Sequence, residues 1–180
     1  MTGSVGKIYS DAIFELAAEQ GCAGQVFEEL TSLRRIWTEN PGLAKILSAP
    51  TISLNEKLGI VEKTFKGRVC ETVYHFLCVL TEKGRASALA EIADAYKEKW
   101  YEKENIAEVT VTTSTPLSDA LRKKLVDKLE SVYSKKVVLE EKTDSSLIGG
   151  IVVNYGNTML DGSVKNRLDS IQKQIRGIIA

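Results

Sequence analysis

The chain has 180 residues, of which 24 are Lys or Arg and 24 are Asp or Glu, so its formal net charge is zero. This balance excludes a globally basic protein that binds nucleic acid by neutralising phosphates. Hydrophobic residues make up 43% of the sequence, which is enough for a buried core and argues against intrinsic disorder.

Three cysteines, Cys22, Cys70 and Cys78, cannot all pair within one chain, which suits a reducing compartment. No apolar run approaches the ~20 residues of a membrane-spanning helix, and the N-terminus lacks the apolar segment of a signal peptide.

The N-terminal part of the sequence follows the spacing of amphipathic helices. Apolar residues recur at three- and four-residue intervals, which places them on one face of each helix. Ser53 and Glu56 have the spacing of a capping box, and Gly84 is placed to end a helix. Because few residues connect successive helices, antiparallel neighbours in a compact bundle are expected. The predicted helices centre on residues 5–16, 26–37, 43–47, 54–65, 69–80 and 89–100.

The first predicted helix has a broad apolar stripe. Gly21 and Gly24 follow it and interrupt the pattern before the second helix. We expect the stripe to consist of Val5, Ile8, Tyr9, Ala12, Ile13 and Leu16.

The apolar pattern changes after residue 105. Residues 109–113 alternate apolar and polar side chains, which is the period of a β-strand. Ser118 and Asp119 are placed to cap a helix with an apolar face. Further strands are expected at residues 137–139, 148–155 and 158–160, with a turn at Gly156-Asn157 between the last two. A final helix is expected after Asp161-Gly162-Ser163, and its apolar face consists of Val164, Leu168, Ile171, Ile175 and Ile178.

These patterns predict an α+β protein with two domains. An N-terminal six-helix all-α bundle is expected over residues 1–105. A small mixed α/β C-terminal domain is expected over residues 106–180.

The sequence offers little catalytic chemistry. His75 is the only histidine, and histidine is the most common general acid or base. Its spacing from Cys70 and Cys78 is poor for a zinc site, so we interpret the cysteines as buried thiols beside a partly exposed imidazole. No phosphate-binding glycine motif or paired metal-ligand motif occurs. We therefore expect no catalytic residue, no metal and no cofactor.

Two glycine-containing segments and one basic segment favour structural roles. Gly149-Gly150 lies inside an apolar strand, which indicates a bulge or a close backbone approach. Asp161-Gly162-Ser163 is interpreted as a turn and helix cap. The basic residues of segment 122–128 share their helix with Asp119 and Asp127, so a solvated helix face is expected.

Taken in order, the C-terminal motifs resemble the signature of the delta subunit of F-type ATP synthases, called OSCP in mitochondria. The motif residues are Val137-x-Leu139, Thr143-Asp144, Leu147-x-Gly149-Gly150-Ile151-x-Val153-Asn154-x-Gly156 and Leu160-Asp161-Gly162-Ser163-Val164-Lys165-x-Arg167-Leu168. Two N-terminal segments are similar to the same family: Tyr9-x-x-Ala12-Ile13-Phe14 and Phe76-Leu77-x-x-Leu80-x-Glu82-Lys83-Gly84-Arg85. The sequence departs from the family at His75, where Asn is usual.

The resemblance implies a non-catalytic stator subunit that links the α3β3 catalytic head to the peripheral-stalk b subunits. It implies that the N-terminal bundle takes the amphipathic N-terminal helix of an α subunit into a groove between the first and fifth helices, and that the C-terminal domain holds the stalk. The residues expected at the groove are Tyr9, Ala12, Ile13, Phe14, His75, Cys78 and Val79. The expected structural signature consists of Gly149, Gly150, Gly156, Asp161, Gly162 and Ser163.

The same resemblance predicts a peripheral protein on the cytoplasmic face of a bacterial membrane, attached only through partner subunits and without nucleic acid. A processed organellar chain would have the same features. One alternative is a two-domain adaptor protein unrelated to ATP synthase, because helical bundles serve many functions. Another is a small enzyme that uses carboxylates or the thiol of Cys78, which would require a pocket of perturbed titratable groups.

Overall fold

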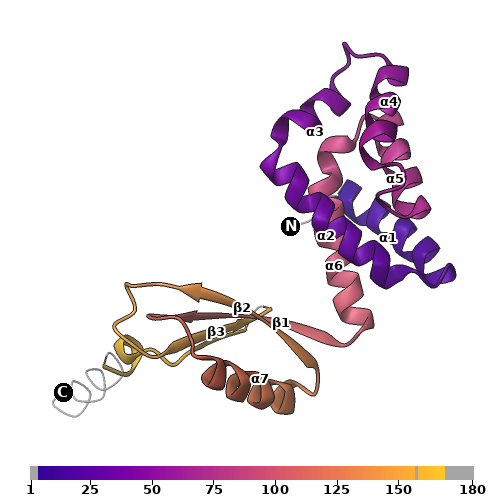
Figure 1. The fold of residues 1–180 in the computed structure, drawn as a ribbon. Coiled ribbons are helices and arrows are strands. Elements are labelled where there is room, and N and C mark those ends of the chain that lie inside the picture. The colour runs from indigo at the N-terminus through magenta and orange to yellow at the C-terminus, as the bar shows by residue number, and fades with distance from the viewer. Residues whose placement is uncertain (1–3, 157, 169–180) are drawn as a thin grey trace. The chain divides into compact units, whose positions relative to one another are not determined.

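The computed structural model describes residues 4–156 and 158–168 of the chain. They form two compact units, and the division between the units lies between Trp100 and Tyr101. The elements of both are drawn in Figure 1. The chain is largely helical and carries one small mixed sheet, so the predicted α+β class is confirmed.

Helices make up the first unit, and the last of them continues past residue 100. Their bounds are α1 (Ser4–Glu19), α2 (Ala23–Glu39), α3 (Pro41–Ser48), α4 (Leu54–Phe65), α5 (Glu71–Glu82) and α6 (Leu89–Lys103), with a short 3-10 helix, η1 (Ala86–Ala88), before α6. The helix ends follow local chemistry. Ser53 and Glu56 form the predicted reciprocal capping box, and Pro41 occupies the first turn of α3, where its missing N–H is not needed. Gly84 follows α5 with a φ of +65°, which favours glycine.

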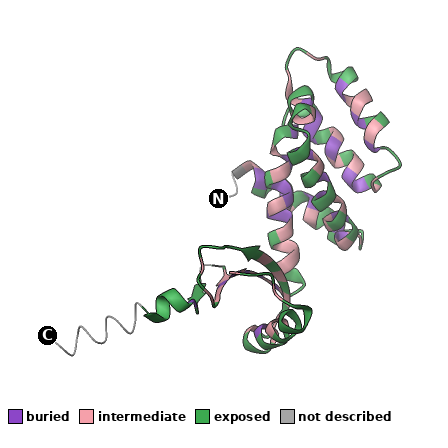
Figure 2. Cartoon of the chain, turned by 60° about the vertical axis from the view of Figure 1, so that its left-hand side comes forward, coloured by how far each residue is buried: buried purple, intermediate pink, exposed green. Residues whose placement is uncertain are grey.

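One apolar core joins the helices of the first unit. Figure 2 shows that the buried residues lie on the helix sides that face one another. Two polar groups within the core are satisfied by backbone oxygens: the indole Nε1 of Trp37 donates to Ala86 O at 2.8 Å, and the hydroxyl of Tyr96 donates to Ala23 O at 2.9 Å. Burial raises the pKa of Tyr96, so its hydroxyl stays a donor. These bonds fix α2 against η1 and α6.

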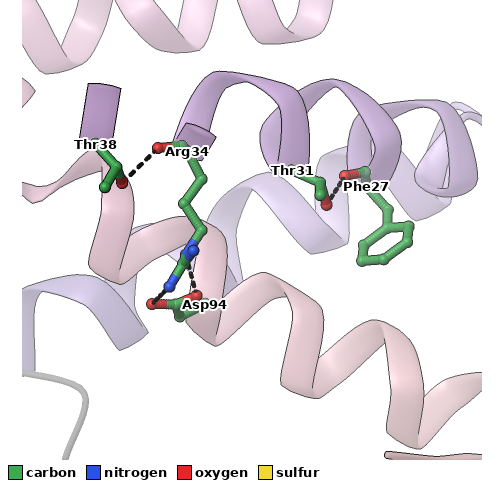
Figure 3. Close-up of polar contacts among 5 residues, drawn as sticks. All are labelled: Phe27, Thr31, Arg34, Thr38 and Asp94. Atoms are coloured by element: carbon green, nitrogen blue, oxygen red, sulfur yellow. Dashed lines mark hydrogen bonds and ion pairs between the residues drawn. The ribbon is translucent and has the colours of Figure 1, made fainter. Parts of the chain in front are cut away.

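An ion pair also joins α2 and α6, as Figure 3 shows. Arg34 Nε lies 2.5 Å from Asp94 Oδ1, and Arg34 Nη2 donates to Asp94 Oδ2 at 3.3 Å. Thr38 on the same helix donates its hydroxyl to the carbonyl of Arg34 at 2.9 Å. Both charged side chains are partly exposed, so the pair contributes orientation more than stability.

The second unit contains a four-stranded sheet and one long helix. The strands are β1 (Ile106–Thr113), β2 (Lys136–Thr143), β3 (Ile151–Tyr155) and β4 (Thr158–Asp161), in the spatial order β2-β1-β3-β4. The helix α7 (Asp119–Tyr133) connects β1 to its parallel neighbour β2, as a parallel pair requires. The other two pairings are antiparallel. Ala107, Val109 and Val111 of β1 form the buried centre of this unit with Leu129 of α7 and Val153 of β3.

Several expectations for the second unit need correction. β3 begins at Ile151 and not at residue 148, because Gly150 has a φ of +91° and leaves the extended conformation. β2 continues through the charged residues to Thr143, because each of them pairs with β1. Ser118 precedes α7, but its side chain makes no capping hydrogen bond. In the last predicted helix, residues 164–168 are helical, and Ile171, Ile175 and Ile178 lie outside the described residues. Asn157 of the predicted turn also lies outside them.

Two corrections concern the first unit. Gly24 lies inside α2, where it faces the indole of Trp100, and only Gly21 interrupts the helices. Ile8 and Leu16 are exposed, although the sequence places them on one apolar stripe with Ile13, which is buried. Among the described residues, none of the helices combines the length and the apolar character needed to cross a bilayer.

Candidate functional site

Helices α1 and α5 lie side by side and run in opposite directions. The rings of Tyr9 on α1 and Phe76 on α5 meet edge to face, with centroids 6.3 Å apart. Beyond the other end of α1, the Thr72 hydroxyl donates to Gln20 Oε1 at 2.5 Å. Early residues of α1 therefore face late residues of α5, and Tyr9 and Phe76 lie between the two helices.

An apolar surface flanks this contact on its solvent side. Ala12 and Leu16 lie on one side of α1, because residues four apart share a helix face. His75 and Val79 have the same relationship on α5, next to Phe76. Leu16 is 44% exposed and Val79 42% exposed, and Ile8, one turn before Ala12, is 64% exposed. We call this surface the α1–α5 face; it consists of Ile8, Tyr9, Ala12, Leu16, His75, Phe76 and Val79.

Arg85 holds Tyr9 in place at this face. Its Nη1 donates to the Tyr9 hydroxyl at 3.2 Å, and its guanidinium lies 5.5 Å from the centre of the Tyr9 ring. A guanidinium over an aromatic ring is attracted by the electron-rich face of that ring. The contact joins two residues that are 76 positions apart in the chain. It fixes the first turns of α1 against the segment that follows α5.

The structure brings together four of the seven residues predicted for the groove. Tyr9, Ala12, His75 and Val79 lie on the α1–α5 face. Ile13 is buried in the core, so its side chain is not available at this surface.

Phe14 and Cys78 lie elsewhere on their helices. The Phe14 ring packs against Tyr96 of α6, with centroids 5.2 Å apart, and lies 5.9 Å from Lys99 Nζ. Cys78 is half-buried beside Tyr74. The pKa of Tyr74 is raised, mainly by burial and to a smaller extent by the hydrogen bond with Cys78.

The groove residues predicted from the sequence do not include Ile8, Leu16 or Phe76, and the contact of Arg85 is not predicted either. A signal for the first two exists, because Ile8, Ala12 and Leu16 follow one another at intervals of four and form a stripe of their own. Arg85 is part of a predicted motif, but its partner lies on another helix. The spacing of residues in the sequence does not reveal that contact.

The glycine motif of the second unit forms a tight junction between β3 and the segment after β4. A Cβ atom on Gly150 would lie 2.5 Å from Gly162 O and 2.8 Å from Ser163 Cα. Backbone hydrogen bonds cross the junction: Gly162 N donates to Ile151 O at 2.9 Å, and Val164 N donates to Gly149 O at 3.0 Å. The close approach that the glycine pair suggests is present at Gly150.

Asp161 and Ser163 cap this junction. Ser163 N donates to Asp161 Oδ1 at 2.9 Å, and Asn166 N donates to Ser163 Oγ at 3.2 Å, as in a helix N-cap. Hydrogen bonding from Ser163 lowers the pKa of Asp161, so this carboxylate stays ionised as an acceptor. Gly156 takes no part in the junction and lies in the turn after β3, with a φ of +54°. These residues are structural, and none is placed as a nucleophile.

The fold and the α1–α5 face define a two-unit protein with an exposed apolar surface on a helical unit. The family model of the ATP synthase delta (OSCP) subunit matches residues 5–175. The chain is 33% identical to ATP synthase subunit delta of Clostridioides difficile (strain 630) over 181 residues, covering 100% of both chains. It is 33% identical to ATP synthase subunit delta of Halalkalibacterium halodurans over 177 residues, covering 96% of this chain and 94% of the relative.

A solved structure has the same fold. A chain of the Toxoplasma gondii mitochondrial ATP synthase hexamer matches with a TM-score of 0.74 at 22% identity, over 96% of this chain and 98% of that chain. The protein belongs to the ATP synthase delta (OSCP) subunit family. Subunits of this family are non-catalytic structural parts of the ATP synthase stator, and they are peripheral components of that membrane-bound complex. The chain therefore serves ATP synthesis and ion transport without a reaction of its own.

Proposed function

We propose that this subunit links the α3β3 head of the ATP synthase to the b subunits of the peripheral stalk. The N-terminal domain, a six-helix bundle over residues 1–105, binds the N-terminal helix of an α subunit at the α1–α5 face. Residues 106–180 bind the stalk. Membership of the delta family and the bacterial relatives support this function at the cytoplasmic face of a bacterial membrane. The observation that carries the proposal is the exposed apolar α1–α5 face.

A helix is the partner that suits this face. Its exposed apolar residues come from two antiparallel helices and line both sides of the contact between Tyr9 and Phe76. An amphipathic helix laid along them buries its own apolar stripe, and each Å² of apolar surface removed from water contributes about 25 cal/mol. Glu71 and Glu82 are exposed on α5 within one turn of His75 and Val79. Basic side chains beside the apolar stripe of the partner would complement these carboxylates.

The mechanical role follows from holding two partners with one chain. A rotor turns inside a stationary head only if the head is held against the torque. This task requires binding free energy and stiffness, and it requires no chemical step. When one chain binds both partners, the second contact forms at high effective concentration, and the combined affinity can exceed either single affinity by ~10²–10⁴.

Ala12→Asp tests the α1–α5 face. We expect the affinity for a peptide of the α-subunit N-terminal helix to fall by roughly 30- to 100-fold, because burying an unpaired carboxylate in an apolar contact costs ~2–3 kcal/mol. Ala12 is exposed in the free chain, so the unit should remain folded. Titration calorimetry with the full chain measures the affinity, and circular dichroism checks the fold.

Ala18→Asp is the matched control for this variant. Ala18 is exposed on the same helix, but it lies six residues from Ala12 and therefore on another side of α1. This control should bind the peptide as the wild type does. Equal affinity of Ala12→Asp, Ala18→Asp and the wild type would contradict the assignment of the face.

A further inference from the structure

Helix α7 leans toward one edge of the sheet in the second unit. It packs against the sheet face that carries Val109, Val111 and Val153 (Figure 1). Its polar contacts with the sheet are made to β2: the Arg122 guanidinium pairs with Glu141, and Val137 N donates to Glu130 Oε1 at 3.1 Å. Glu130 therefore lies on the flank of α7 that faces β2.

The opposite flank of α7 is apolar and exposed. Leu121 and Val132 lie on one side of α7, because eleven residues complete about three helical turns. Leu121 is 56% exposed and Val132 66% exposed. About 180° of helical rotation separates Leu121 from Glu130, so these side chains lie on the flank away from β2. The strand order β2-β1-β3-β4 places β3 and β4 on that side.

Strand β4 extends the same uncovered surface. Leu160 pairs with Val153 of β3, and residues paired across antiparallel strands share one face of the sheet. Leu160 therefore lies on the face that α7 covers elsewhere, yet it is 56% exposed. We call the uncovered surface the α7–β4 face; it consists of Leu121, Lys124, Lys128, Val132 and Leu160.

The charge of this surface indicates which partner it fits. Lys124 and Lys128 are exposed and lie within a turn of Leu121 and Val132 on the same flank. The chain's own end does not complement them, because residues 164–180 carry Lys165, Arg167, Lys173 and Arg176 against one acidic residue, Asp169. A basic apolar surface favours a partner with carboxylates beside an apolar stripe.

We propose that the α7–β4 face binds an amphipathic helix of the stalk b subunits through an apolar stripe flanked by acidic residues. This inference rests on the proposed function, which assigns the stalk to the second unit. Leu121, Val132 and Leu160 supply the apolar contact, and the two lysines orient the helix. Attraction between the lysines and the carboxylates also speeds association and makes it sensitive to salt.

The experiment measures binding of the full chain to the soluble part of the b subunits of the same ATP synthase. Leu121→Glu should weaken binding at least about tenfold, because buried apolar anchors carry most of the binding energy. Val138→Glu is its control, since Val138 is exposed on the opposite face of the sheet. Lys128→Glu should slow association and reduce the salt dependence, and Lys123→Glu, the same change on another side of α7, should do neither.

Each outcome separates this inference from the proposed function. If Leu121→Glu and Lys128→Glu bind the b subunits as well as the wild type does, the assignment of this binding to the α7–β4 face is wrong, and the stator function stands. If the wild type binds the α-subunit peptide but no b subunit, the stalk assignment fails and this inference fails with it. A chain ending at residue 168 should retain binding. Loss of binding on that truncation, with Leu121→Glu unaffected, would place the stalk on residues 169–180 and overturn the inference.

Discussion

Gly150→Ala should destabilise the second unit by about 2–4 kcal/mol, because a left-handed residue with a side chain costs ~1–2 kcal/mol and the new methyl group also overpacks a tight contact. The φ of Gly150 is +91°, and its added Cβ would lie 2.5 Å from a backbone carbonyl oxygen of the β4 junction. Backbone atoms cannot rotate away as a flexible side chain can. We therefore expect β3 to separate from the segment that begins at Gly162.

Gly149→Ala is the matched control for this prediction. Its Cβ would meet only a methyl group of Val164, at an ordinary contact distance of 3.4 Å. This change should shift stability by less than about 1 kcal/mol. Urea denaturation followed by circular dichroism compares the two variants, and binding of the b subunits should fall with Gly150→Ala alone. Equal stability of the two variants would contradict the close approach of the backbone at Gly150.

Trp37→Ala should destabilise the first unit by about 3–5 kcal/mol, the range for removal of a buried aromatic side chain. Trp37 is buried, packs against Phe65 with ring centroids 5.8 Å apart, and donates its indole N–H to Ala86 O. The substitution leaves a cavity between α2, α4 and η1, and it leaves the carbonyl of Ala86 without this donor. Such a loss is a large part of the ~5–15 kcal/mol that stabilises an ordinary domain.

Trp100→Ala provides the comparison, because Trp100 is half-buried and water can fill part of the space it leaves. We expect a loss of about 1–2 kcal/mol for this variant. Trp37 and Trp100 are the only tryptophans, so each variant retains one fluorescent probe of unfolding. A smaller loss for Trp37→Ala than for Trp100→Ala would contradict the described core.

Local chemistry explains which parts of the fold the sequence predicts. The capping box of Ser53 and Glu56 and the helix end at Gly84 depend on residues within one helical turn, and both are confirmed. The strand predicted from the alternating residues 109–113 is also confirmed as part of β1. Its residues alternate because β1 lies inside the sheet and buries one face. In these cases, the determining interactions lie close together in the chain.

The remaining features depend on distant neighbours. Ile8 and Leu16 share the predicted apolar stripe with the buried Ile13, yet they are exposed, because none of the described elements of the first unit covers that side of α1. Ile13 is one position from Ala12, but one residue is a rotation of about 100° and brings it into the core. The charged end of β2 becomes a strand through its pairing with β1. The position of Arg85 at Tyr9 depends on the packing of α1 beside α5.

Simultaneous binding of both partners is the property that a subunit joining the head to the stalk must have. Native mass spectrometry of the full chain, mixed with the α-subunit N-terminal peptide and the soluble part of the b subunits, shows which complexes form. We expect one complex that contains all three components. We also expect that Ala12→Asp loses only the peptide and that Leu121→Glu loses only the b subunits. Mutually exclusive binding of the two partners, or binding of neither, would contradict a subunit that joins the head to the stalk.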